Sequence, residues 1–140
     1  MSVEDEKAER RSDVAEGSGR SDSQLRQVSR AMVKIYKEQF GRGPTSAHSY
    51  YTNPNTITCF LEGSLTPVEQ TLAKLGEHTR LRDTRLLFQY ADENAFRGAV
   101  ETITGRRVVA FISGIDTEAD VSIETFVLAP RDLLSQDVDG

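Results

Sequence analysis

The stretch that decides the fold is TITCFLEGSLTPVE, residues 56–69. Its first half alternates in polarity, which is typical of a β-strand that is buried on one side. Its second half is a helix start, in which Thr66 is the N-cap, Pro67 takes the first helical position and Glu69 completes a capping box. The stretch therefore predicts a strand and then a helix, with only a short loop between them.

Three further strands are predicted around this pair. Residues 46–52 come first and are joined to the central strand by the turn-forming sequence Asn-Pro-Asn at 53–55, which indicates a hairpin. The runs 106–113 and 121–128 are rich in Val, Ile and Phe, and the polar loop 114–120 joins them. Because neighbouring strands with short connections usually pair, we expect an antiparallel sheet.

Two helices are predicted to cover one face of this sheet. Apolar side chains recur at three- and four-residue steps over residues 23–40, and Gly41 ends that helix. The second helix runs over residues 66–104, with a break or kink at 76–78. Its second part is expected to keep one inner face made of Leu81, either Leu87 or Phe88, Ala91, Ala95, Ala99 and Ile103. The order α-β-β-α-β-β predicts an α+β two-layer sandwich, a four-stranded, mainly antiparallel sheet with two helices.

Charge divides the chain into three parts. The net charge is −5, of which −3 falls in residues 1–22 and −2 in residues 131–140, whereas residues 23–130 are neutral. Residues 1–22 have few large apolar side chains to offset the entropy of ordering, so we predict a disordered acidic tail. Residues 23–130 are predicted to form one domain, and residues 131–140 a flexible C-terminal tail.

Helices on one face leave the opposite face of an antiparallel sheet uncovered. Apolar side chains are predicted there from Phe60, Phe126 and either Val109 or Phe111. We therefore expect a homodimer that covers this face.

Side chains that carry chemistry are sparse. His48 and His78 fall in different elements with no acidic or cysteine neighbour at ligand spacing, so no metal is expected. Cys59 faces inward and is predicted to be an inert, buried thiol, and a single cysteine fits a reducing compartment. No catalytic constellation is present, so we predict a protein that is not an enzyme and needs no cofactor.

Membrane and export signals are also missing from the sequence. No apolar run approaches the roughly 20 residues that span a bilayer, and the first residues lack the apolar core of a secretory signal. We expect a cytoplasmic protein, with a peripheral position at the inner face of the membrane as the alternative.

Two charge patterns remain. Arg26, Arg30, Lys34 and Lys37 follow one another at helical spacing and form one basic stripe on the first helix. The stripe is either a solvated face or a surface for an acidic partner, anionic lipid or nucleic acid; the neutral central region makes nucleic acid the weakest of these. The acidic residues form a second pattern near the end of the domain, interpreted as a solvated loop with a cation site as the alternative: Asp116, Glu118, Asp120 and Glu124.

Several blocks of sequence resemble those of one family. They are SRAMVK at 29–34, GRGP at 41–44, LEGSLTPVEQTL at 61–72, VETITGRRVVAF at 100–111 and FVLAP at 126–130. Together they resemble the MpsC-like family, small domains named after a component of a sodium-translocating, membrane-potential-generating system. The resemblance implies an accessory or regulatory subunit of a membrane ion or inorganic-carbon transport system, whose other components are membrane proteins. It carries over no catalytic residues.

Within these blocks, four charged side chains are not explained by turn or strand formation: Arg42, Glu62, Arg106 and Arg107. Arg42 and Glu62 either form an ion pair at the sheet edge or belong to a surface for a partner or small anion. The leading hypothesis is a non-enzymatic interaction subunit that uses Arg30 and Lys34. The alternatives are a small-anion or metabolite sensor with Arg42 and Arg106 in its pocket and, less favoured, a nucleic-acid-binding protein.

Overall fold

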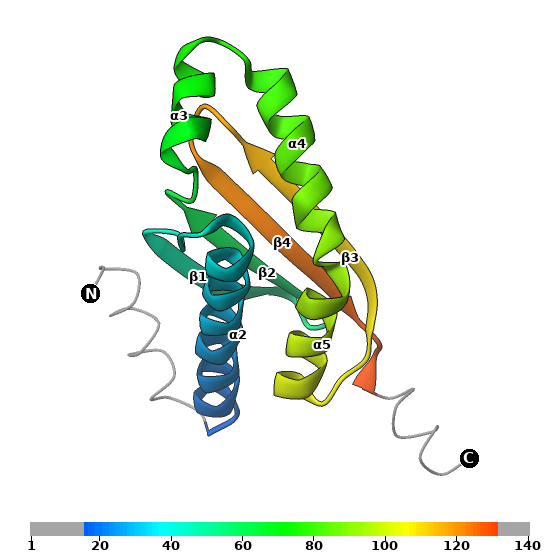
Figure 1. Cartoon of the computed structure of the whole chain (residues 1–140). Coiled ribbons are helices and arrows are strands. Elements are labelled where there is room, and N and C mark those ends of the chain that lie inside the picture. Colours follow the sequence, from blue (N-terminus) through cyan, green and yellow to red (C-terminus); the bar gives the residue numbers. More distant parts are fainter. Residues whose placement is uncertain (1–15, 132–140) are drawn as a thin grey trace.

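Four strands and four helices make up the described part of the chain, residues 16–131 of a computed structural model (Figure 1). The strands form one antiparallel sheet in the order β1-β2-β4-β3, and the helices lie on one of its faces. In chain order, the elements are α2 (Glu16–Phe40), β1 (Ser46–Asn53), β2 (Thr56–Glu62), α3 (Pro67–Lys74), α4 (His78–Ala91), α5 (Glu93–Thr104), β3 (Val108–Asp116) and β4 (Val121–Leu128). The predicted α+β sandwich is confirmed.

The helices differ from the prediction in number and length. The first helix starts at Glu16 instead of Ser23, so residues 16–22 belong to α2; residues 1–15 and 132–140 of the two predicted tails lie outside the described residues. The second helix is divided into α3, α4 and α5. Gly76, at φ +80°, ends the first piece where a break was predicted, whereas the joint at Asp92 was not foreseen.

The start of α3 matches the capping box. The Thr66 hydroxyl accepts from the Glu69 amide at 3.3 Å, and the Glu69 carboxylate accepts from the Thr66 amide at 2.9 Å. Such reciprocal bonds satisfy two amides that the helix leaves unpaired. The local sequence therefore fixes where α3 begins.

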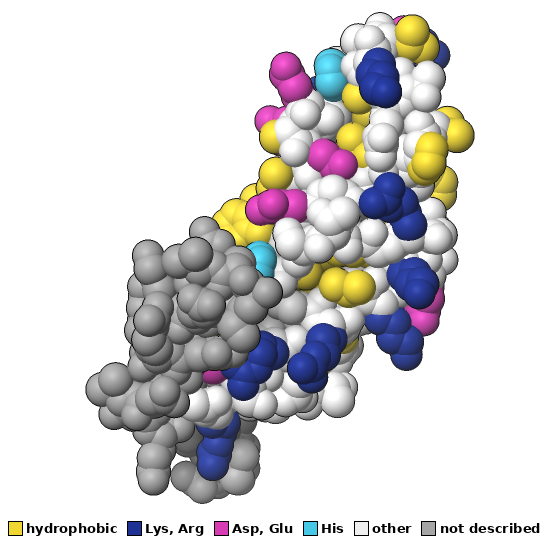
Figure 2. Space-filling model, turned by 90° about the vertical axis from the view of Figure 1, so that its left-hand side faces the viewer, with side chains coloured by type: hydrophobic (Ala, Val, Ile, Leu, Met, Phe, Trp, Pro, Cys, Tyr) yellow, Lys and Arg dark blue, Asp and Glu magenta, His cyan; other side chains and the backbone are white. Residues whose placement is uncertain are grey.

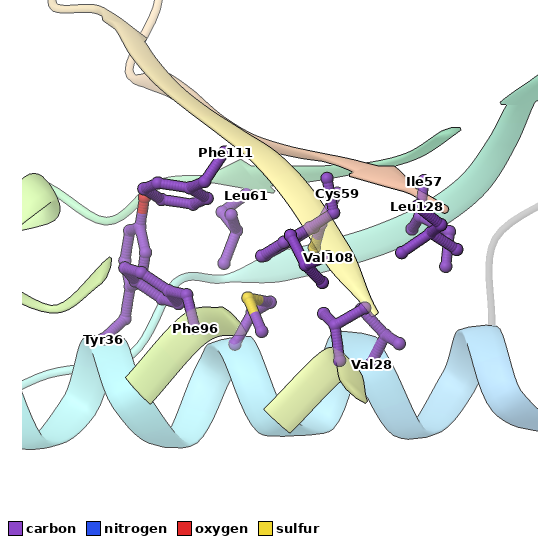
Figure 3. Close-up of a cluster of buried hydrophobic side chains, with 12 residues drawn as sticks. Val28, Tyr36, Ile57, Cys59, Leu61, Phe96, Val108, Phe111 and Leu128 are labelled. Atoms are coloured by element: carbon purple, nitrogen blue, oxygen red, sulfur yellow. The ribbon is translucent and has the colours of Figure 1, made fainter. Parts of the chain in front are cut away.

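The core lies between the sheet and the helices α2 and α5 (Figure 3). Val28 and Tyr36 point from α2 toward the strands, and Phe96 of α5 packs beside Tyr36. Phe111 of β3 lies opposite Phe126 of β4 in the register, and both are buried in this core. Their predicted place on the uncovered face is wrong, because β4 buries Phe126 together with every second residue on its helix side.

The sheet face opposite the helices carries a few exposed apolar side chains. Phe60 is exposed there as predicted, and its ring contacts that of Tyr50 with centroids 6.1 Å apart. Ile112, also exposed, lies in the same cross-strand row as Thr125 and Thr58. Aromatic and β-branched side chains thus stand on the face opposite the helices.

Candidate functional site

The basic stripe occupies an exposed face of α2. Arg26, Arg30, Lys34 and Lys37 are all exposed, and within residues 19–131 none of them takes part in an ion pair. Other cations are paired with a residue three or four positions earlier: Arg80 lies 3.9 Å from Glu77, and Arg97 lies 2.7 Å from Glu93. Figure 2 looks onto the side of the molecule where β1 lies in Figure 1, and shows Lys and Arg side chains gathered over its lower half.

A groove of about 300 Å³ runs between this helix and the edge strand β1. Arg30 of the stripe lines it, so a ligand in the groove would meet the middle of the stripe. The remaining lining residues are small or apolar: Ser29, Val33, Pro44, Thr45, Ser46 and Ala47.

Arg42 is a half-buried structural residue. Its guanidinium donates to the carbonyls of Gly63 at 3.1 Å and Leu65 at 3.2 Å. No ion pair joins it to Glu62 among the described residues, and Glu62 is exposed. Arg42 therefore fixes the loop between β2 and α3, and the ion pair with Glu62, one of the two alternatives from the sequence, is not formed within residues 19–131.

Arg106 has a similar structural role at the other end of β2. It is 3% exposed, and it donates to the Pro54 carbonyl at 3.1 Å, the Asn55 side chain at 2.6 Å and the Ala129 carbonyl at 2.9 Å. Burial lowers the pKa of this guanidinium, and the neighbouring Arg131 charge adds to the effect.

Because Arg42 and Arg106 bind main chain at opposite ends of one strand, they do not share an anion pocket. Arg107 is exposed beside Arg106 and lies on neither the stripe nor the groove. Of the six candidate residues, the structure keeps Arg30 and Lys34 together on one exposed face.

The acidic pattern is not one solvated patch. Asp120 accepts from the amides of Ser64 and Leu65, and Asp116 accepts from two amides of its own turn. Glu124 is fully buried, because it lies on the side of β4 that faces the helices. Within the described residues no group of three or more His, Cys, Asp or Glu could hold a metal ion.

A buried polar cluster, missed from the sequence, joins α2, α4 and the sheet. The Tyr36 hydroxyl donates to Glu124 Oε2 at 2.6 Å, and Gln89 donates to Ser113 Oγ at 2.6 Å and to Glu124 Oε2 at 3.4 Å. Glu124 Oε1 has no hydrogen-bond partner in the described part of the chain. Only one of the two carboxyl oxygens of the buried Glu124 therefore accepts hydrogen bonds from the described residues.

Arg85 is the cationic member of this region and is also fully buried. Its guanidinium lies 3.1 Å from the Glu69 carboxylate, donates to Ser64 Oγ at 3.0 Å and stands 3.8 Å above the centre of the Phe40 ring. A buried cation needs such partners, because desolvation would otherwise cost several kcal/mol, roughly. Arg85 thereby ties α4 to α2 and to the start of α3.

The position of Glu124 changes its acidity. Burial raises its pKa from 4.5 to about 8, although hydrogen bonds from Ser113 and Tyr36 and the charge of Arg85 act in the opposite direction. The pKa of Tyr36 is also raised, by burial first and by Glu124 second. Burial therefore favours the protonated form of Glu124.

One sequence signal for the cluster exists on α4. Leu81, Arg85 and Gln89 recur at steps of four and are the buried residues of that helix. The inner face predicted from Leu87 and Phe88 is wrong, since both are exposed. The buried face of α4 could be predicted from the spacing of Leu81, Arg85 and Gln89 only by assigning an arginine and a glutamine to the core.

The predicted burial of Cys59 is confirmed, and His78 makes one contact with a neighbouring side chain. Cys59 is fully buried, and burial raises its pKa to about 12. His78 Nδ1 lies 2.7 Å from the Thr117 hydroxyl, a contact that fits a structural role. In residues 16–131 no helix combines the length and the apolar character needed to cross a bilayer.

The fold and the site define an α+β domain with helices on one sheet face, a buried carboxyl group in its core and, on its first helix, an exposed basic stripe that has no ion pair within residues 19–131. The sequence model of one family, described as Na+-translocating membrane potential-generating system (MpsC), matches residues 22–130, and the chain belongs to this family. No curated protein and no solved structure matches the chain.

Proposed function

We propose that this chain is a non-enzymatic accessory subunit that docks, on the cytoplasmic side, onto an acidic surface of a membrane-embedded ion or inorganic-carbon transport system. The family description, a Na+-translocating membrane potential-generating system, supports the transport setting. The observation that carries the docking role is the basic stripe. Its four cations are exposed and have no ion pair within residues 19–131.

A row of cations with no ion pair within residues 19–131 favours a counter-charge from a partner. Neighbouring cations on one helix face repel each other by a few tenths of a kcal/mol, roughly, unless an anionic partner is bound. A complementary acidic surface would relieve this repulsion and speed encounter. The groove beside Arg30 gives the same face a shape that a protein segment could enter.

Charge reversal of Arg30 and Lys34 tests the proposal. The full chain is mixed with membranes from its native cells, the membranes are sedimented, and the bound fraction is compared for wild type and the R30E/K34E variant. We expect wild type to sediment with the membranes, the variant to stay in the supernatant, and both to have the same melting temperature. Equal sedimentation of both proteins would contradict the proposal.

Two controls separate a protein partner from other causes. The R80E/R82E variant makes the same change in charge on α4, where both arginines are exposed, and should still bind. Vesicles made from the extracted lipids should bind much less than the membranes. Equal binding to the vesicles would identify anionic lipid as the target instead.

We also propose that the chain forms a homodimer through its uncovered sheet face. The exposed Phe60 and Ile112 support this proposal, since apolar side chains that are grouped on an exposed surface often mark a contact with another protein. Light scattering should give the mass of two chains, and Phe60→Glu should give one. A monomer at every concentration would contradict the dimer.

A further inference from the structure

The two edge strands of the sheet, β3 and β1, differ in whether side chains bond to their outward main-chain groups. On β3, the Tyr90 hydroxyl accepts from the Ser113 amide at 3.0 Å and donates to the Ser113 carbonyl at 3.3 Å. At Val108, Glu101 accepts from the amide at 2.9 Å and Arg97 donates to the carbonyl at 3.1 Å. Side chains of α4 and α5 thus occupy outward main-chain groups of this edge, a known way to prevent strand addition.

On the opposite edge, β1, no side chain of residues 16–131 bonds to the outward main chain in this way. The Gly63 amide donates to the Asp120 carbonyl and the Leu128 amide to the Asn55 carbonyl, so odd-numbered residues of β2 bond to β4. Even-numbered residues of β2 therefore bond to β1, which leaves the main chain of Ala47, Ser49 and Tyr51 pointing outward. None of these three amides or carbonyls has a hydrogen-bond partner within residues 16–131.

The open edge adjoins the groove and the basic stripe. Ala47 lines the groove from the strand side and Arg30 from the helix side. Arg26 and Lys34 lie one helical turn on either side of Arg30, on the same face of α2. A strand laid along β1 would therefore send alternate side chains toward three cations, and the others toward the exposed Phe60 face.

We propose that an extended, acidic segment of the partner protein adds to β1 as a fifth strand, with its carboxylates facing the basic stripe. This inference rests on the proposed docking function and specifies its contact. Main-chain hydrogen bonds to Ala47, Ser49 and Tyr51 supply general affinity, and the charges of α2 select an acidic sequence. The apolar floor of the groove, Val33 and Pro44, accepts the stems of the carboxylate side chains.

A second copy of this chain is a poorer occupant of the same edge. Pairing β1 with β1 across a twofold axis would bring two α2 helices to the same side of a continuous sheet. Arg26, Arg30 and Lys34 of one copy would then approach the same cations of the other. Like charges in that position oppose association, whereas an acidic strand neutralises them.

A peptide of eight residues that alternates Glu and Val, labelled and capped at both ends, tests the inference on the full chain. We expect the peptide to bind by fluorescence anisotropy, a Lys-Val peptide not to bind, and R30E/K34E to weaken binding at least tenfold. R80E/R82E should bind as wild type does.

Alternate N-methylation of the peptide tests strand pairing itself. Only every second amide of an added strand bonds to its neighbour, so methylation of either all Glu or all Val amides should abolish binding, and methylation of the other set should not. Bound peptide should slow hydrogen exchange at the amides of Ala47, Ser49 and Tyr51 at least tenfold. The amide of His48, which already faces β2, should change little.

Three results would overturn the inference. Indifference to N-methylation, with binding still lost in R30E/K34E, would leave a charged docking surface but no added strand. Slow hydrogen exchange at the amides of Ala47 and Ser49 in the protein without peptide would show that the β1 edge is already occupied. If the exchange slows further as the protein concentration rises, the occupant is a second copy; otherwise it is a segment of the same molecule. Absence of peptide binding would also refute it, while membrane sedimentation would still test the proposed function independently.

Discussion

Replacement of Glu124 by Gln should make this protein more stable, and the gain should grow with pH. The side chain lies in the core, where its Oε2 accepts a 2.6 Å hydrogen bond from Tyr36. Gln keeps the size of the side chain and an oxygen for Tyr36, but it cannot ionise. The comparison of the two proteins therefore isolates the effect of the buried charge.

The size of the gain follows from the two pKa values of Glu124. The group ionises near 4.5 in the unfolded chain and near 8 in the folded one, so between these values the folded state binds more protons. The free energy of unfolding then falls by about 1.4 kcal/mol per pH unit as pH rises, and the loss levels off above pH 8. From pH 5 to pH 8 the E124Q protein should gain on the order of 4 kcal/mol relative to wild type.

Urea denaturation of both proteins at intervals from pH 5 to pH 9 measures this difference. The exposed Glu118 provides a matched control, because E118Q makes the same substitution at the surface. A flat difference for E124Q would mean that Glu124 ionises at an ordinary pKa. A difference that falls with pH would mean that the charge of Arg85 stabilises the carboxylate, and would refute the reasoning.

The other predictions concern single side chains. Cys59 should react with a thiol reagent in native protein at least a hundredfold more slowly than in urea, because it is buried and burial raises its pKa to about 12; equal rates would contradict this. Arg106→Met should lower stability by about 2 to 4 kcal/mol in thermal unfolding, since three acceptors lose their donor, whereas Arg107→Met should change it by less than about 0.5 kcal/mol. Tyr90→Phe should leave the main-chain amide and carbonyl of Ser113 at the β3 edge without a partner, and light scattering should then show more aggregation. Unchanged scattering would mean that Tyr90 does not protect this edge from strand addition.

The parts of the fold that follow from local sequence could be predicted. The strand β2 and the capping box at Thr66 depend on residues close together in the sequence. The capping box is confirmed, and Ile57, Cys59 and Leu61 are buried as expected, although Thr58 between them is buried as well. The joint at Asp92 could not be predicted, because neither glycine nor proline marks it. The early start of α2 was also missed, since glycine and serine at 17–19 are poor helix formers on their own.

The candidate site was predictable only where it is exposed. The stripe of α2 follows from helical spacing alone. Burial of Arg85 and Glu124, by contrast, depends on partners in other elements, Glu69 and Tyr36 among them. A single sequence does not show those contacts, so Glu124 was assigned to a solvated acidic pattern. The same reason explains Arg42 and Arg106, whose acceptors are carbonyls far along the chain.

Affinity capture from detergent-solubilised native membranes tests whether the basic stripe docks on a membrane-embedded partner. Wild type and R30E/K34E are used as baits in parallel, and captured proteins are identified by mass spectrometry. The account predicts that subunits with several membrane spans are enriched with wild type and lost with the variant. Capture of the same membrane proteins by both baits, or of the chain alone by wild type, would contradict it.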